Sequence, residues 1–205
     1  MGPEFYREDV TEKRWQLLQQ LHRQYDIVMI GGWAVWASTH QDKTRNIDIV
    51  VDYDTLGVLR QAFPNLHKNH RLKEYEIPQG VFDVDVYVPH YSTTLTVPPD
   101  YLLTQHLTQE GFRVPPPEAL LGLKLGAWWE RRDSIHGQQD LRDIGGWLPW
   151  CTLPAVRQLG LEAHLTTAQV ERIAAAWQAA KPQIPKRLRE AFERPKAARP
   201  RGAIR

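Results

Sequence analysis

The chain has 205 residues, of which 42% are hydrophobic and 24% are charged, and its formal net charge is +2. These values are typical of a globular protein with one sizeable core and exclude a disordered or fibrous chain. One cysteine, Cys151, excludes an internal disulfide, and neither a membrane-length apolar run nor a signal peptide is visible, so we expect a cytoplasmic protein that does not enter a membrane.

The first half of the chain predicts an α/β (α+β) domain with a mixed sheet. Helical spacing of apolar residues alternates with short strand patterns and glycine turns. The expected elements are a helix over 11–24, a strand over 26–30, a tight turn at Gly31-Gly32, a helix over 33–39, a strand over 46–52, a helix over 54–63 capped by Asp54, and a hairpin of strands over 70–77 and 81–88.

From Pro115 onward the pattern becomes helical. Pro-Pro-Pro-Glu is typical of a helix start, and the run ALLGLKLGAWWERR is apolar nearly all round, which predicts a core helix. Further helices are expected over 138–147 and 167–180. We therefore expect a domain over 1–114, a helical C-terminal segment over 115–180 and a tail over 181–205.

The tail is strongly basic and contains prolines. It carries nine Lys and Arg against Glu190 and Glu193, so the remainder of the chain is acidic. Such a tail either neutralises nucleic-acid phosphates or is a solvated terminus. The sequence leaves both interpretations open.

Two predicted strands carry carboxylates inside apolar runs. Asp48 lies within the run 47–51, and Asn46 shares its face because alternate strand residues point to the same side. Asp83 and Asp85 share a face of the later strand for the same reason. A carboxylate in a buried strand is costly unless it is paired or binds a metal, so these residues are candidate ligands.

If the two strands are neighbours, these side chains meet beside the Gly31-Gly32 turn. Clustered carboxylates repel each other in the absence of a cation, and oxygen ligands alone indicate Mg²⁺ or Mn²⁺. A glycine turn that leads into a helix offers N–H groups and a positive dipole end to phosphate. Together these features predict phosphoryl or nucleotidyl transfer by a two-metal route.

Three segments resemble the nucleotidyltransferase superfamily, which includes DNA polymerase beta, CCA-adding enzymes, aminoglycoside nucleotidyltransferases and AbiEii-type toxins. KTRNIDIVVD at 43–52 is similar to the usual R-x-T-x-D-I-D stretch, with Asp42 in place of its leading Arg. FDVDVYVPHY at 82–91 resembles the strand that brings the third carboxylate in CCA-adding enzymes. VPPPEALLGLKLGAWWERRDSIHGQQDLRDI at 114–144 resembles the block that follows the catalytic domain in small prokaryotic AbiEii-like members.

This resemblance implies a nucleotidyltransferase-type sheet with flanking helices and a helical segment behind it. It also implies transfer of a nucleoside monophosphate from an NTP to a hydroxyl of RNA, protein or a small molecule. The implied metal ligands are Asp48 and Asp85, with Asn46 or Asp83, and the Gly31-Gly32 turn would hold phosphates. The register of the later strand favours Asp85 over Asp83 as the third carboxylate.

Asn46 departs from the family pattern, because it occupies the position of the first metal-binding Asp. An amide oxygen can ligate a hard cation, but it lacks the charge and cannot bridge two metals. Asp83 is the candidate that would restore the lost charge. The departure predicts a protein that binds an NTP but transfers slowly.

Lys124 lies in the helix with almost no polar face. A buried Lys needs an anion, because otherwise it deprotonates or destabilises the core. The candidates are Asp140 or Asp143 in the next helix, or the triphosphate of a bound nucleotide. Both alternatives stay open in the sequence.

Two other classes of function compete with the enzyme. Asn46 favours a catalytically impaired module that binds a nucleotide or a partner, as in a toxin–antitoxin or regulatory pair. The basic tail favours a nucleic-acid-binding protein. The oligomeric state is not indicated by any pattern in the sequence.

Overall fold

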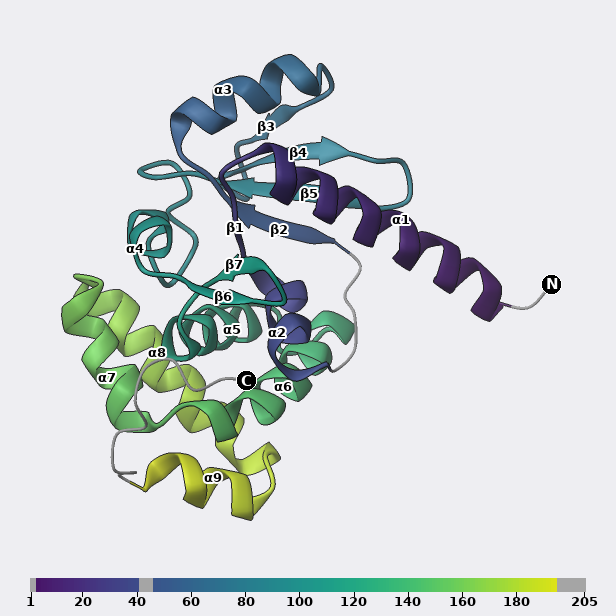
Figure 1. Ribbon diagram of the computed structural model, residues 1–205. Coiled ribbons are helices and arrows are strands. Elements are labelled where there is room, and N and C mark those ends of the chain that lie inside the picture. The colour runs from purple at the N-terminus through teal and green to yellow at the C-terminus, as the bar shows by residue number, and fades with distance from the viewer. Residues whose placement is uncertain (1–2, 41–45, 195–205) are drawn as a thin grey trace.

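The computed structural model describes residues 3–40 and 46–194, and its first half is built on a five-stranded mixed sheet (Figure 1). The strands lie in the order β1–β2–β5–β4–β3; β2 and β5 are parallel, and the other neighbours are antiparallel. Their bounds are Val28–Met29 (β1), Ile47–Val50 (β2), His67–Asn69 (β3), Glu74–Pro78 (β4) and Asp83–Tyr87 (β5).

One face of the sheet is apolar and packs against two helices, α1 (Pro3–Gln24) and α3 (Tyr53–Ala62). Alternate residues of the central strands supply this face, as the period of two requires. The core on this side contains Leu18, Leu21, Ile47, Ile49, Leu56, Leu59, Tyr75, Ile77, Val84 and Val86, all of them buried.

The opposite face changes from apolar to polar along the strands. Val28 and Val50 pack with residues of α4 (Pro99–Thr104) and α5 (Pro117–Arg131). Farther along β2 and β5, the residues that alternate with the apolar core are Asp48 and Asp85. Helices α2 (Gly31–Thr39) and α5 lie on this side of the sheet in Figure 1. The acidic side chains therefore lie between the sheet and the helical half.

The second half is a helical assembly around α5. It contains α6 (Ile135–Trp147), α7 (Leu153–Glu162), α8 (Thr167–Ala180) and α9 (Lys186–Glu193), with short 3₁₀ turns at Leu148–Trp150 and Lys181–Gln183. A two-stranded ribbon, β6 (Leu107–Gln109) and β7 (Phe112–Val114), precedes α5. The fold is a mixed sheet with flanking helices and a helical C-terminal part, as the sequence predicted.

Several details differ from the sequence-based expectations. Helix α1 begins at Pro3 rather than near residue 11. The side chain of Asp52, not Asp54, caps α3 by accepting a hydrogen bond from the Thr55 N–H at 2.7 Å. The strand expected over 70–77 begins only at Glu74. Strands β3, β6 and β7 and helices α4, α7 and α9 were not predicted.

Part of the expected tail is folded. Helix α9 buries Phe192 completely, and its ring contacts Trp177 edge-on with ring centroids 4.7 Å apart. Residues 195–205 of the tail, and residues 41–45 of the motif around Asn46, lie outside the described residues. Among the helices that the structure describes, none combines the length and apolar character needed to cross a membrane.

Candidate functional site

Asp48 and Asp85 lie side by side on neighbouring parallel strands. The register pairs Asp48 of β2 directly with Asp85 of β5, which confirms that the two strands are neighbours. Asn46 precedes β2, and its side-chain amide donates a hydrogen bond to Oδ2 of Asp85 at 3.3 Å. Three of the residues predicted from the sequence therefore come together at this point of the sheet.

Gly31 lies against Asp48 at the start of α2. Its φ of +65° is in the left-handed region, and a Cβ at this position would overlap the Asp48 carboxylate. Both the backbone conformation and the available space therefore require glycine here. The first hydrogen bond along the helix runs from the Ala34 N–H to the Ile30 carbonyl, so the N–H groups of Gly31 and Gly32 are not used inside α2.

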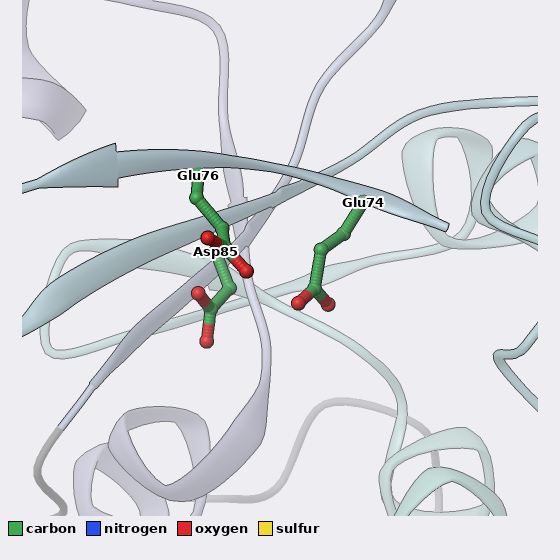
Figure 2. Close-up of side chains that lie close together, drawn as sticks. All are labelled: Glu74, Glu76 and Asp85. Carbon is green, nitrogen blue, oxygen red and sulfur yellow. The ribbon is translucent and has the colours of Figure 1, made fainter. Parts of the chain in front are cut away.

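Two glutamates that the sequence analysis missed join Asp85. Glu76 of β4 pairs with Asp85 in the antiparallel register, and Glu74 lies two residues before Glu76 on the same face of β4. Figure 2 shows the three side chains projecting to the same side of the sheet from the two strands. One carboxylate oxygen from each lies within 4.8 Å of the others. We call Glu74, Glu76 and Asp85 the carboxylate cluster.

Burial and mutual repulsion raise the pKa values of two members of the carboxylate cluster, Asp85 and Glu74. Burial raises the pKa of Asp85 to about 8, with further contributions from the charges of Asp48 and Glu74, while the hydrogen bond from Asn46 opposes the shift. Burial also raises the pKa of Glu74 to about 7. Carboxyl groups in this state hold protons at neutral pH unless a cation replaces them.

Asp48 is half-buried, and the loss of solvent around its carboxyl is the main cause that raises its pKa. The charges of Lys124 and Arg131 and a hydrogen bond with Tyr87 act in the opposite direction. Tyr87 lies on the same face of β5 as Asp85, and burial raises the pKa of its hydroxyl well above the ordinary value. The charges of Asp48, Glu74 and Asp85 all raise the pKa of Tyr87 further, so Tyr87 lies between Asp48 and the carboxylate cluster electrostatically.

Lys124 is engaged by two aspartates in the helical half. Its Nζ lies 2.6 Å from Oδ2 of Asp143 and 3.3 Å from Oδ1 of Asp140. Arg131 donates two hydrogen bonds to Asp140, at 2.7 and 3.1 Å. We call these four residues the ion-paired network. The sequence left open whether Lys124 pairs with aspartates of the next helix or with a triphosphate. The structure shows the aspartate partners, and a contact of Lys124 with a triphosphate stays a prediction.

Asp83 lies two residues before Asp85 on the same face, opposite Pro78 of the hairpin. It is half-buried, and the close group of ligand atoms found among the described residues does not include it. Its assignment as a metal ligand stays a prediction. Glu74 and Glu76 were detectable only through the register of the hairpin, which places Glu76 opposite Asp85 and not opposite Asp83.

The residues present fit a hard divalent cation. Their donor atoms are carboxylate oxygens, which Mg²⁺ and Mn²⁺ prefer, and they converge from two strands. The nearby cations Lys124 and Arg131 already form ion pairs with Asp140 and Asp143. The carboxylate cluster therefore has the composition and the charge of a magnesium or manganese site.

Comparison with known proteins gives a structural likeness but no match in sequence. No family model matches the chain, and no curated protein does. The structure is similar to a nucleotidyltransferase-like protein from Paracoccidioides brasiliensis, with a TM-score of 0.52 and 18% identity over 92% of this chain and 95% of that chain. A weaker likeness, with a TM-score of 0.44 and 12% identity, relates 86% of the chain to 94% of JHP933 from Helicobacter pylori. From the first likeness we conclude that this chain has a nucleotidyltransferase-like fold.

Proposed function

We propose that this protein is a metal-dependent nucleotidyltransferase that moves a nucleoside monophosphate from an NTP to a hydroxyl acceptor. The observation that carries the proposal is the meeting of Asp48, Asp85 and the carboxylate cluster on one face of a nucleotidyltransferase-like sheet. Acidic groups so close together, at the start of a helix that follows a glycine turn, are suited to a metal-bound triphosphate.

Each residue has a distinct part in this proposal. Asp85 and Asp48 hold Mg²⁺ or Mn²⁺, with Glu74 and Glu76 as additional oxygen ligands and Asn46 or Asp83 as the remaining candidates. The bound metal would neutralise the triphosphate and lower the pKa of the acceptor hydroxyl. The N–H groups of Gly31 and Gly32, which α2 does not use, bind phosphate oxygens. Lys124 adds positive potential near Asp48, since its charge lowers the pKa of that carboxyl.

A second candidate function is a nucleotide- or partner-binding module with impaired catalysis, as in a toxin–antitoxin or regulatory pair. The contact of Asn46 favours it: the side chain points its N–H, not its oxygen, at Asp85. As arranged, Asn46 supports a ligand and does not present one. Such a site would keep a nucleotide-bound metal and lack one ligand for a second metal.

Two measurements on the same variants separate these candidates. Calorimetry with each NTP, with and without Mg²⁺, measures binding, and mass spectrometry of reactions with labelled NTP measures transfer to RNA, protein or small molecules. We expect Asp48→Asn and Asp85→Asn to abolish the Mg²⁺-dependent part of binding. Asp54→Asn changes an exposed carboxylate of α3, on the other side of the sheet, and serves as the matched control.

Asn46→Asp distinguishes a slow enzyme from a binding module. If the missing carboxylate limits catalysis, this variant raises turnover by two to three orders of magnitude, or about 3–4 kcal/mol of transition-state stabilisation, with little change in NTP affinity. Binding without transfer in both forms would support the module. NTP binding that is independent of Mg²⁺, or unchanged in Asp48→Asn and Asp85→Asn, would contradict both candidates.

A further inference from the structure

The edge of the sheet beside the carboxylate cluster carries concentrated positive charge. Residues 55–73 contain no Asp or Glu. Four exposed cations lie in this segment, and we call them the edge cations: Arg60, Lys68, Arg71 and Lys73. Among residues 3–40 and 46–194, none of the four forms an ion pair, in contrast to Lys124 and Arg131.

Three of the edge cations gather around two tyrosine rings. Lys68 lies 4.0 Å from the ring centre of Tyr91 and 5.8 Å from that of Tyr75. Lys73 lies 5.7 Å from Tyr91, and Arg60 lies 5.1 Å from Tyr75. The two rings are 5.3 Å apart. The ring faces attract these cations but do not neutralise them, so the positive charges lie close together without an ion pair in the part of the chain that the structure describes.

The edge cations are physically joined to the carboxylate cluster through β3. His67 contacts Glu76 at 3.1 Å, and the side-chain amide of Asn69 donates a hydrogen bond to the other oxygen of Glu76 at 2.5 Å. The same Asn69 side chain accepts hydrogen bonds from the N–H groups of Arg71 and Leu72, both at 3.0 Å. Lys68 of β3 pairs with Tyr75 and lies on the opposite face of the sheet from His67 and Asn69, which pair with Glu76 and Glu74. The positive surface therefore reaches the acidic site around the edge of the sheet.

Protection of an open sheet edge is the simplest other explanation, since native proteins place Lys on such edges to prevent pairing between molecules. That purpose is served by charges of either sign on the edge strand itself. Here the charges are all positive and extend beyond β3 to Arg60 on α3. One-signed charge of this kind is complementary to a phosphate backbone.

We propose that the edge cations bind the phosphate backbone of a single-stranded nucleic acid, which presents its terminal hydroxyl to the carboxylate cluster. As a binding surface the inference stands alone, whereas the acceptor role rests on the proposed function. A nucleic acid is favoured over an acidic protein because the surface adjoins a site suited to metal-bound phosphates, where the end of a bound strand can react.

The test measures binding of a fluorescent single-stranded RNA, and of DNA with the same sequence, over a range of salt concentrations in EDTA without NTP. The test variant changes all four edge cations to Gln. The matched control changes four exposed cations on α1, α7 and α9, so that its net charge is the same: Lys13, Arg23, Arg157 and Arg187. Circular dichroism and analytical ultracentrifugation establish that each variant is folded and monodisperse.

We expect the slope of log K against log salt concentration to fall by about 0.7 for each phosphate that the edge variant no longer neutralises, and to fall less in the control. The edge variant should retain Mg²⁺-dependent NTP binding, and Asp85→Asn should retain RNA and DNA binding, so the two proposals can fail separately. Equally weakened binding in both variants would overturn the inference, as would equally tight binding of a polyglutamate peptide. Aggregation of the edge variant with unchanged binding would assign the charges to edge protection.

Discussion

Two groups of carboxylates in this protein have opposite surroundings. Asp140 and Asp143 in the helical half are only 2% exposed, and both contact Lys124, while Arg131 also holds Asp140. Asp85 and Glu74 on the sheet have acidic neighbours instead, and their pKa values are raised to about 8 and about 7. Carboxylates that are neutralised within the chain depend on their partners and are costly to leave unpaired, whereas those left among like charges indicate a site for a cation from outside.

Removing Lys124 tests the ion-paired network and should have the largest effect. Among the described residues, Lys124→Met leaves Asp143 with the hydrogen bond from Gln139 at 3.0 Å, and it weakens the neutralisation of Asp140. Breaking a buried pair on one side costs about 3–5 kcal/mol, so we expect a decrease of that size in the free energy of unfolding, measured in urea. The double variant Lys124→Met/Asp143→Asn should recover part of the lost free energy of unfolding. A decrease below about 1 kcal/mol would contradict the structural role of the network.

Gly31→Ala tests the contact between the glycine turn and Asp48, and should have an intermediate effect. Positive φ in a residue with a Cβ costs about 1–3 kcal/mol, and here the Cβ also overlaps the Asp48 carboxylate. Gly57→Ala is the matched control, because Gly57 lies in α3 with open space around it, and its change should be neutral or stabilising by up to about 1 kcal/mol. Equal unfolding free energies for the two variants would remove the steric argument for Gly31.

Asp85 and Glu74 of the carboxylate cluster should make the free energy of unfolding depend on pH. Because the pKa values of Asp85 and Glu74 are raised, the folded protein binds more protons than the unfolded chain between about pH 4 and pH 8. The free energy of unfolding should therefore fall as the pH rises through this range in EDTA, by at most about 1.4 kcal/mol per pH unit for each proton.

Variants and metal sharpen this pH test. Glu74→Gln should flatten the pH dependence of the free energy of unfolding up to about pH 7. Asp85→Asn should flatten it up to about pH 8, since each variant removes one titrating group. Added Mg²⁺ should stabilise the protein more at pH 8 than at pH 5, because it replaces the protons on the carboxylates. Unaltered pH dependence in both variants would show that these carboxyl groups are not the source of the effect.

The sequence was sufficient to find the residues that break a local pattern. Asp48 and Asp85 were identified because a charge inside an alternating apolar strand has few explanations, and Gly31 because it precedes a helix. Helix α8 was predicted with its observed bounds, 167–180, and its start is set by a capping box of Thr166 and Gln169 that depends only on neighbouring residues.

Residues whose surroundings come from distant segments could not be assigned in this way. Glu74 and Glu76 resemble ordinary surface residues of a strand, and only the hairpin register brings Glu76 opposite Asp85. The short polar strand His67–Asn69 has no apolar pattern of its own and forms by pairing with β4. The cap of α3 was assigned to Asp54 instead of Asp52, because either residue fits the local signal.

The sequence by itself determined which residues carry unusual charge: carboxylates in apolar strands, a lysine in an apolar helix and a basic tail. The tertiary structure decided which of these charges compensate one another. It paired Lys124 with Asp140 and Asp143, and left Asp85 with Glu74 and Glu76. The physical reason is that strand and helix periods are set by neighbouring residues, whereas electrostatic energies depend on distances between side chains that the chain brings together only when it folds.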